Sequence, residues 1–193
     1  HDASDLADDA ATKKTGETLS NYKTTGYCAT LTHDQVSNPR TIIIDFGPTN
    51  CMCNDGRNRN GKILVSYTGN YTDSGSEHTI TFENYYVDDY LVMGTNVVTN
   101  RGLNGASQPK FTSVINGKVL KPGSLDTLFY EAQRNIVWTE GSTTPVWGDD
   151  VYEITGTATG KNELKTFYAM TITQPLVKEV LGCRYFTKGK IEM

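Results

Sequence analysis

Apolar and polar residues alternate along GKILVSYTGN, the stretch at 61–70. In an extended strand, Ile63, Val65 and Tyr67 point to one side and the residues between them point to the other. The same period of two recurs almost to the C-terminus, interrupted by Gly, Asn and Asp, which favour tight turns. The pattern predicts an antiparallel β-sheet. It predicts no particular chemistry, because sheets of this kind host many unrelated functions.

The alternation divides the chain into about eleven expected strands, spaced roughly 8–14 residues apart. They cover 27–33, 41–47, 61–71, 77–87, 90–100, 110–117, 124–131, 135–141, 151–160, 165–173 and 183–193. A single helical turn is expected at 175–181, and the absence of strand–helix–strand alternation argues against a parallel sheet. We therefore expect one all-β domain at 24–193, built as a meander, a sandwich or a curved half-barrel. Glycines inside strands, such as Gly94 and Gly156, predict bends and a strongly coiled sheet.

Residues 1–23 differ from the rest of the chain, because they are acidic at the start and poor in strand formers. Ser4 is a suitable N-cap for a short helix, and the aspartates that follow it would lie near the positive end of that helix. The segment is expected to be either this short helix or a disordered leader. In an anchored protein it would serve as a tether; the alternative is a frayed terminus without a role.

The charge and the hydropathy of the chain limit the classes of partner that we expect. The 18 Lys and Arg against 22 Asp and Glu give a net charge of −4. A nucleic-acid surface requires clustered cations, and none occur, so no nucleic-acid partner is expected. No run of about 18 apolar residues is present, so no membrane span is expected. The chain begins with His1 rather than Met, so we expect a processed chain, and the missing signal peptide carries no weight against export.

Sequence motifs for common catalytic and cofactor sites are missing. The chain has no Gly-rich phosphate loop, no dinucleotide fingerprint, no nucleophile elbow and no zinc-protease helix. A zinc site favours CxxC spacing, whereas Cys51 and Cys53 are separated by one residue, and the histidines stand at 1, 33 and 78. We therefore expect no cofactor and no metal, and an enzyme is not the first expectation.

Four cysteines, Cys28, Cys51, Cys53 and Cys183, are spread along the chain, and four cysteines allow three pairings. A bond between Cys51 and Cys53 would close a very tight ring, whose geometry rarely suits a disulfide. The two other pairings each join one member of that couple to Cys28 and the other to Cys183. Either would close long loops worth about 3–5 kcal/mol each. We expect disulfides, which belong to exported proteins; four reduced, partly buried thiols are the alternative.

Two pairs of neighbouring aspartates are candidates for chemistry. Asp88-Asp89 and Asp149-Asp150 each stand at an expected strand boundary. Glycoside hydrolysis needs two carboxyl groups about 5–10 Å apart across a cleft, and these pairs could supply them. A polysaccharide-acting enzyme is therefore one hypothesis. Adjacent aspartates more often serve turns by bonding their own backbone, which is the alternative.

The aromatic residues give a stronger indication of function than the aspartate pairs do. Tyr85 and Tyr86 lie beside the expected turn at Asp88. Trp147 lies in a loop, next to the aspartate pair at 149–150. Exposed aromatic rings flanked by carboxylates suit sugars, whose C–H faces stack while their hydroxyls form hydrogen bonds. These aromatic and acidic residues are the predicted ligand-binding set, although Tyr85 and Tyr86 also fit ordinary cross-strand packing.

A set of motifs carries a family resemblance: TIIIDFG, DGRNRNGKILVSYTG, ITFENYYV, VTNRG, DDVYEITGTATG and CRYFTKGKIE. Together they resemble a family of exported proteins common in Bacteroidetes bacteria, many of which look like lipoproteins, and the resemblance spans nearly all of 26–193. That family has no assigned activity and no established catalytic residues, so it assigns no site here. The resemblance implies export to the periplasm or cell surface. It supports disulfides among the four cysteines without fixing their pairing, and it suggests that residues 1–23 follow a lipid-anchor site.

From the sequence we expect an exported, non-catalytic module of the cell envelope that is structural or binds a glycan, a peptide or another envelope protein. One alternative is a polysaccharide-acting enzyme that uses Asp88, Asp149 or Asp150. Another is a carrier of an apolar ligand with a barrel-like cavity. Each of these functions predicts a different geometry of the binding surface. A carrier has a continuous apolar face around an empty interior, an enzyme has two carboxylates facing each other across a groove, and a glycan binder exposes Trp147 or Tyr85.

Overall fold

A computed structural model of the protein describes residues 29–53, 56–123, 127–181 and 185–193. Within these residues, eleven strands form one antiparallel sheet. The strands are β1 (Thr30–Asp34), β2 (Arg40–Asp45), β3 (Cys51–Met52), β4 (Asn58–Tyr67), β5 (Glu77–Val87), β6 (Tyr90–Leu103), β7 (Pro109–Leu120), β8 (Thr127–Glu140), β9 (Val151–Lys161), β10 (Phe167–Glu179) and β11 (Lys188–Glu192). The predicted all-β class is confirmed. The leader expected at 1–23 lies outside the described residues.

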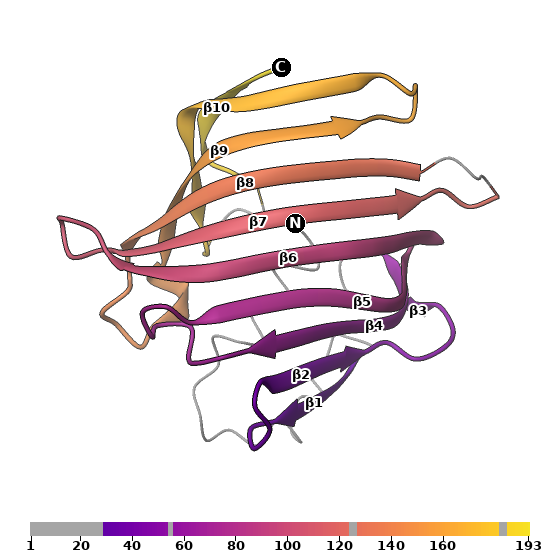
Figure 1. The fold of residues 1–193 in the computed structure, drawn as a ribbon, viewed down its shortest axis with the longest axis horizontal. Coiled ribbons are helices and arrows are strands. Elements are labelled where there is room, and N and C mark those ends of the chain that lie inside the picture. Colours follow the sequence, from indigo (N-terminus) through magenta and orange to yellow (C-terminus); the bar gives the residue numbers. More distant parts are fainter. Residues whose placement is uncertain (1–28, 54–55, 124–126, 182–184) are drawn as a thin grey trace.

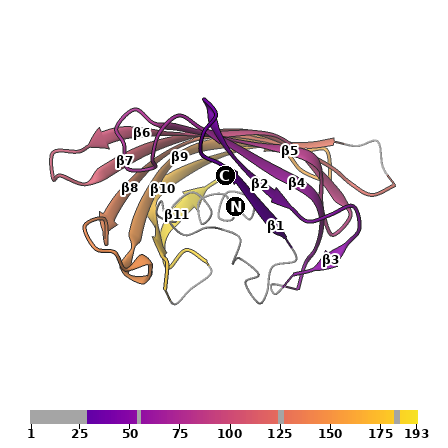
Figure 2. The same ribbon diagram turned by 90° about the horizontal axis from the view of Figure 1, so that it is seen from below.

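The sheet follows the chain from one edge to the other. Its strand order is β1-β2-β4-β5-β6-β7-β8-β9-β10-β11, and β3 pairs with β4 beside that path. No pairing in the described residues joins the edge strands β1 and β11, so the sheet is open (Figure 1). Seen from below, it curves into an arch with one concave side (Figure 2). Of the expected architectures, the sheet is a meander that curves like a half-barrel, and it is not a sandwich, because a sandwich needs a second sheet packed on the first.

Several strand ends shift by a few residues from the prediction, and three elements differ from it in kind. The short β3 is not predicted, whereas β8 is one continuous strand where two are expected, at 124–131 and 135–141. The polar residues Gln133 and Arg134 stay within β8, because successive side chains of a strand point to opposite faces and both faces accommodate them. The helical turn expected at 175–181 is wrong, since β10 continues to Glu179 across a register shift.

Two glycines produce bends that the sequence predicts. Gly94 has a φ of 113°, and a Cβ built there would lie 2.0 Å from the carbonyl oxygen of Asn116. Gly156 has a φ of 138°, and its Cβ would lie 2.1 Å from the carbonyl oxygen of Gln133. Other residues rarely adopt such φ values, and no real Cβ approaches a backbone oxygen so closely. Glycine is therefore required where β6 and β9 bend along the arch.

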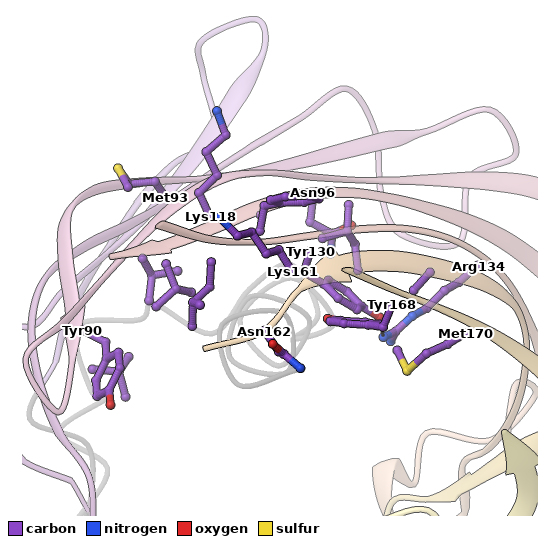
Figure 3. A pocket seen from close by; sticks show the side chains of 18 of the residues that line it. Tyr90, Met93, Asn96, Lys118, Tyr130, Arg134, Lys161, Asn162, Tyr168 and Met170 are labelled. Atoms are coloured by element: carbon purple, nitrogen blue, oxygen red, sulfur yellow. Dashed lines mark hydrogen bonds between the residues drawn. The ribbon is translucent and has the colours of Figure 1, made fainter. Parts of the chain in front are cut away.

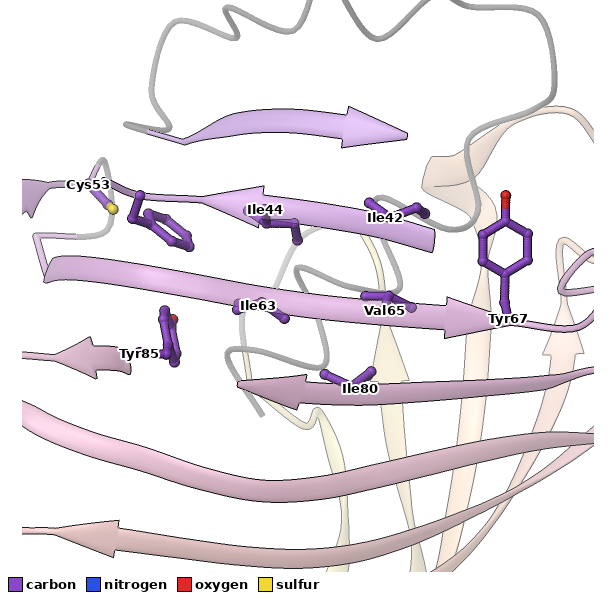
Figure 4. Packing of buried hydrophobic residues seen from close by; sticks show 9 residues of the cluster. Ile42, Ile44, Cys53, Ile63, Val65, Tyr67, Ile80 and Tyr85 are labelled. Atoms are coloured by element: carbon purple, nitrogen blue, oxygen red, sulfur yellow. The ribbon is translucent and has the colours of Figure 1, made fainter. Parts of the chain in front are cut away.

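A cluster of buried hydrophobic residues lies in the part of the sheet made by β2, β4 and β5 (Figure 4). Ile42 of β2 pairs with Val65 of β4, and Val65 in turn pairs with Ile80 of β5. Ile44 of β2 pairs with Ile63 of β4. All five side chains are 5% exposed or less, and each contributes about 1.5–3 kcal/mol on full burial. The buried cluster also contains Phe46, Cys53, Tyr67 and Tyr85.

One helical element interrupts the described strands. It is η2 (Trp147–Asp149), a single 3₁₀ turn in the loop between β8 and β9. The described part of the chain holds no helix with the length and apolar character that a membrane crossing requires. The η2 loop carries three residues of the predicted ligand-binding set: Trp147, Asp149 and Asp150.

Candidate functional site

A cavity of about 910 Å³ lies on the concave side of the sheet (Figure 3). Strands β5 to β10 supply most of its wall, and Phe186 and Ile191 border it from the C-terminal part of the chain. The cavity and the buried cluster share one face of the sheet, because Ile80 of the cluster pairs with Asn96, which borders the cavity. Most of the wall is apolar, and its inward-facing aliphatic residues include Val92, Ile115, Val119, Leu128, Ala158 and Met170.

Strand periodicity explains why the concave face is apolar. Ile115 and Val119 of β7 are separated by an even number of residues, so both face the cavity. Lys118, between them, points to the opposite, convex face, and so does its register partner Met93 of β6 (Figure 3). The alternation along β7 thus places aliphatic side chains on the concave face and Lys118 on the convex one.

Small residues at the inward-facing positions of β9 leave space in the cavity wall. The inward-facing positions of this strand are held by Gly156, Ala158 and Gly160. Arg134 of β8 pairs with Gly156. Tyr130 of β8 and Tyr168 of β10 both pair with Gly160. A Cβ on Gly160 would lie 2.4 Å from the Tyr168 hydroxyl oxygen, so the Tyr168 side chain occupies the space that the glycine leaves.

Tyr130, Arg134 and Tyr168 form a polar cluster on the concave wall (Figure 3). Arg134 Nη2 donates a hydrogen bond to the Tyr130 hydroxyl at 2.7 Å, and the guanidinium carbon lies 5.9 Å from the centroid of the Tyr130 ring. Burial and, to a smaller extent, the neighbouring Tyr130 raise the pKa of Tyr168, so its hydroxyl is neutral near pH 7. The polar cluster therefore brings one guanidinium and two hydroxyl groups together on the concave wall.

Two residues of the predicted set border this cavity. Tyr85 is 1% exposed, and its ring stacks on Phe82 with the centroids 5.6 Å apart. Asp88 stands in the β5–β6 turn with a φ of 50°, and its Oδ1 accepts a hydrogen bond from the backbone N–H of Asn58 at 2.9 Å. Tyr86 follows Tyr85 along β5 and therefore points to the opposite face of the sheet.

The other predicted residues lie in the β8–β9 loop, and those with described side chains do not border the cavity. The Thr144 hydroxyl oxygen lies 2.9 Å from both carboxylate oxygens of Asp149. Asp150 is 6% exposed and accepts a hydrogen bond from Trp138 Nε1 at 3.1 Å. Burial raises the pKa of Asp150, and the negative charge of Asp149 adds to the rise. The side chain of Trp147 lies outside the described part of the structure.

The polar cluster is not among the residues predicted from the sequence. A signal for it is present in the spacing of small residues at 156–160, Gly-x-Ala-x-Gly, which leaves an inward-facing groove along one strand. Side chains on the neighbouring strands then fill or border that groove. Recognising the polar cluster therefore requires the register of β8 and β10 against β9, which a single sequence does not supply.

The predicted disulfide set is described only in part. Cys53 is 4% exposed, and its Sγ lies 3.7 Å from the carbonyl oxygen of Cys51. Cys51 is disulfide-bonded, whereas Cys53 takes part in no disulfide, so the prediction that all four cysteines form disulfides is wrong for Cys53. Cys28 and Cys183 lie outside the described residues, so the partner of Cys51 stays a prediction. Across the described ranges, no three His, Cys, Asp or Glu side chains are grouped so that they could hold a metal ion.

Comparisons of the chain with protein-family models, with curated proteins and with solved structures find no match. The geometry of the cavity is therefore the basis on which its function is inferred.

Proposed function

We propose that the protein is a non-catalytic binding module that holds a ligand with an apolar body in its concave cavity. The observation that carries this proposal is the cavity itself. Its volume of about 910 Å³ lies within the range of about 300–1,000 Å³ that is typical of ligand sites. Its wall combines a mostly apolar surface with a small group of polar side chains, which is the usual composition of a small-molecule site.

An aliphatic ligand would gain its affinity from burial. Moving one methylene group from water to an apolar site contributes about 0.8 kcal/mol. A chain of about ten buried methylenes would therefore contribute roughly 8 kcal/mol before the cost of ordering the ligand is subtracted. Without that cost this gross value would give a Kd of about 1 μM, so it sets the upper limit of the affinity that ten methylenes supply.

The other expected functions receive less support from the described residues. A sugar ring stacks on an exposed aromatic face, whereas Tyr85 is buried against Phe82. Glycoside hydrolysis requires two carboxyl groups across a groove. Asp88 borders the cavity but accepts a hydrogen bond from the backbone of Asn58 at the start of β4, and Asp150 bonds to Trp138 outside the cavity. A binding role therefore explains the geometry better than catalysis does.

We further infer that the module is exported and held at the periplasmic or outer face of the cell envelope by a lipid anchor that precedes residues 1–23. Two observations support this inference: the resemblance of its motifs to exported proteins and the disulfide bond formed by Cys51. Alkylation of the unreduced protein purified from its own cells, followed by mass spectrometry, tests it. Four alkylated cysteines would contradict the export proposal, and fewer than four would support it.

Ligand binding is tested with purified protein and 1-dodecanol, followed by native mass spectrometry and by displacement of a fluorescent apolar dye. The Ala158→Phe variant places a ring in the cavity, because Ala158 faces inward on β9. Ala169→Phe is the matched control, since Ala169 pairs with Thr159 and is exposed on the convex face. Ala158→Phe is expected to weaken dodecanol binding at least about tenfold while the control keeps the wild-type affinity.

Two results would contradict the proposal. One is a wild-type protein that binds neither dodecanol nor the dye in the micromolar range. The other is equal binding by the two alanine variants, which would place the ligand away from the cavity. Far-ultraviolet circular dichroism establishes that both variants are folded before their affinities are compared.

A further inference from the structure

Two lysines and two phenylalanines alternate in a line across the convex face, close to the ends of β7 and β9. Lys118 of β7 pairs with Phe129 of β8, and Phe129 pairs with Lys161 of β9. Lys161 in turn pairs with Phe167 of β10. Their neighbours along the strands face the cavity: Val119, Tyr130, Gly160 and Tyr168. Because successive side chains of a strand point to opposite faces, the four residues point to the convex face, where Figure 3 shows Lys118. We call them the convex row.

The apolar part of the convex row is exposed. Phe167 is 71% exposed, and its ring lies 5.7 Å from that of Phe129, centroid to centroid. The turn between β9 and β10 adds Leu164, which is 83% exposed. The Leu164 backbone N–H donates a hydrogen bond to Asn162 Oδ1 at 3.0 Å, which fixes the turn that presents this side chain. Three large apolar side chains at one end of the sheet form a patch of the kind that marks an interaction site.

The cationic part of the convex row has no acidic partner in the described part of the chain. Lys118 and Lys161 are two strands apart, about 10 Å at the usual strand spacing, and neither forms an ion pair there. Glu163 of the neighbouring turn is paired with Lys121 Nζ at 3.5 Å. Glu131 lies two positions beyond Phe129 on the same face and forms no ion pair with either lysine. The convex row is therefore complementary to a partner that is anionic and has an apolar interior.

We propose that the convex row and Leu164 dock the protein on the surface of an anionic lipid bilayer. This interaction goes beyond the ligand binding proposed above. Interfacial segments of proteins place Phe and Leu side chains at the boundary between head groups and acyl chains, and their lysines attract anionic lipids. The long Lys side chain can lie along apolar surface while its ammonium group reaches the head groups.

The shape of the surface favours a bilayer over a peptide or a glycan. A peptide is held in a groove or along the edge of a sheet, whereas the convex row crosses the strands on an outward-curving face. Glycan sites combine aromatic rings with groups that hydrogen-bond to hydroxyls, and a phenylalanine ring carries no such group. A bilayer accepts side chains that protrude, and its acyl region accepts side chains without polar atoms.

The same end of the sheet borders the concave cavity. Leu128 of β8 precedes Phe129 and faces the cavity, and Asn162, which begins the turn that carries Leu164, borders it as well. Docking through the convex row therefore brings one end of the cavity close to the bilayer, where apolar molecules dissolve.

Vesicle flotation tests the proposal. The 193-residue chain is mixed with vesicles of phosphatidylcholine alone or of an equal mixture of phosphatidylcholine and phosphatidylglycerol, and the floating protein is quantified. Wild-type protein is expected to bind the mixed vesicles at least about tenfold more strongly, because each lysine near an anionic surface adds attraction. Sodium chloride should weaken this binding, since it screens exposed charges.

Two variants test the apolar part and the cationic part. Leu164→Ser combined with Phe167→Ser should weaken binding to the mixed vesicles at least about tenfold, since both apolar side chains are lost from the interface. Lys161→Gln should weaken it about fivefold. Circular dichroism establishes folding, and if the double variant does not fold, Leu164→Ser alone should weaken binding at least about threefold.

Each variant has a matched control at the opposite end of the sheet. Leu103→Ser removes an apolar side chain that is 62% exposed on β6, where this strand pairs with the start of β7. Lys110→Gln removes a lysine from β7, eight residues before Lys118 and therefore on the same face. Both controls should bind the mixed vesicles like the wild type.

Three results would overturn the docking proposal. They are a wild-type protein that does not float with the mixed vesicles, controls that lose as much binding as the matched variants, and binding to soluble dextran sulfate in place of vesicles. The last result would indicate an anionic polymer as the partner. The dodecanol measurements concern the concave face, so the ligand-binding proposal and the docking proposal can fail separately.

Discussion

His78 lies stacked on Tyr67, with the ring centroids 5.4 Å apart and the ring planes inclined by 19°. Tyr71 contacts the same imidazole edge-on, at a centroid distance of 5.4 Å. His78 is 4% exposed, and burial lowers its pKa. The folded protein therefore holds this imidazole in the neutral form at pH values where an exposed histidine begins to take up a proton.

This burial predicts that stability decreases in mildly acidic solution. The unfolded chain, in which the pKa is near 6.5, binds the proton first as the pH falls. The stabilising contribution is thus complete above pH 6.5 and is lost as the pH falls from there to the lower folded-state pKa. The loss is about 1.4 kcal/mol for each pH unit between the two values.

Urea unfolding between pH 8 and pH 5 measures this decrease. His78→Phe keeps an aromatic ring on Tyr67 but cannot titrate, so its unfolding free energy should fall less steeply over this range. His33, whose pKa burial and Arg40 also lower, is present in both proteins, so part of the decrease remains in His78→Phe. Parallel pH profiles for the two proteins would contradict the assignment to His78.

Asp150 predicts the opposite dependence of folding stability on pH. Burial raises its pKa, so its charged form destabilises the folded protein as the pH rises through the folded-state value. Asp150→Asn removes that charge and keeps an oxygen that accepts from Trp138 Nε1. We expect it to be at least as stable as the wild type at pH 7, with the gain disappearing below the ordinary pKa of 3.8.

Asp150→Ala distinguishes the hydrogen bond from the charge. It removes the acceptor of the Trp138 N–H, and it should lower the unfolding free energy by about 1–3 kcal/mol at pH 7. Chemical denaturation of the two variants side by side makes the comparison. A large loss in Asp150→Asn, equal to that in Asp150→Ala, would show that the carboxylate charge itself stabilises the loop.

The bend at Gly94 predicts a position that accepts no side chain. Gly94→Ala would force a Cβ to within 2.0 Å of the Asn116 carbonyl oxygen at a φ of 113°. We expect a loss of at least about 1–3 kcal/mol in unfolding free energy. Gly105→Ala is the control, because a Cβ at Gly105 meets no atom within 4 Å, and its effect should stay within about 0.5 kcal/mol. Equal losses would contradict the strained bend.

Much of the fold follows from periodicity, and particular residues show where the inference stops. Ile63 and Val65 alternate with half-buried neighbours, and this pattern predicts both the strand and its buried face. Gln133 and Arg134 suggest a break between two strands because both are polar. In the structure they lie within one strand, since Arg134 faces the cavity while Gln133 faces solvent. A polar residue that points into a cavity has the same sequence signature as a turn residue.

The candidate site is harder to predict than the fold, because it depends on register. Tyr130 and Tyr168 are about forty residues apart and meet across Gly160 only after two strand pairings have been set. Asp88 and Tyr85 are predicted as a ligand site from their proximity in the sequence, and both do border the cavity. The Asp88 carboxylate is nevertheless bonded to the backbone of Asn58, and the Tyr85 side chain belongs to the buried cluster, which a single sequence cannot reveal.

The most direct test of the apolar cavity uses the methionine methyl groups as reporters. Met170 faces the cavity on β10, whereas Met52 and Met193 do not border it and are 64% and 91% exposed. In protein labelled with ¹³C at the methionine methyls, titration with 1-dodecanol should shift the Met170 resonance and leave those of Met52 and Met193 in place. Dodecanol binding that moves the Met52 or Met193 resonance, or that leaves Met170 unmoved at saturation, would contradict a ligand site in the concave cavity.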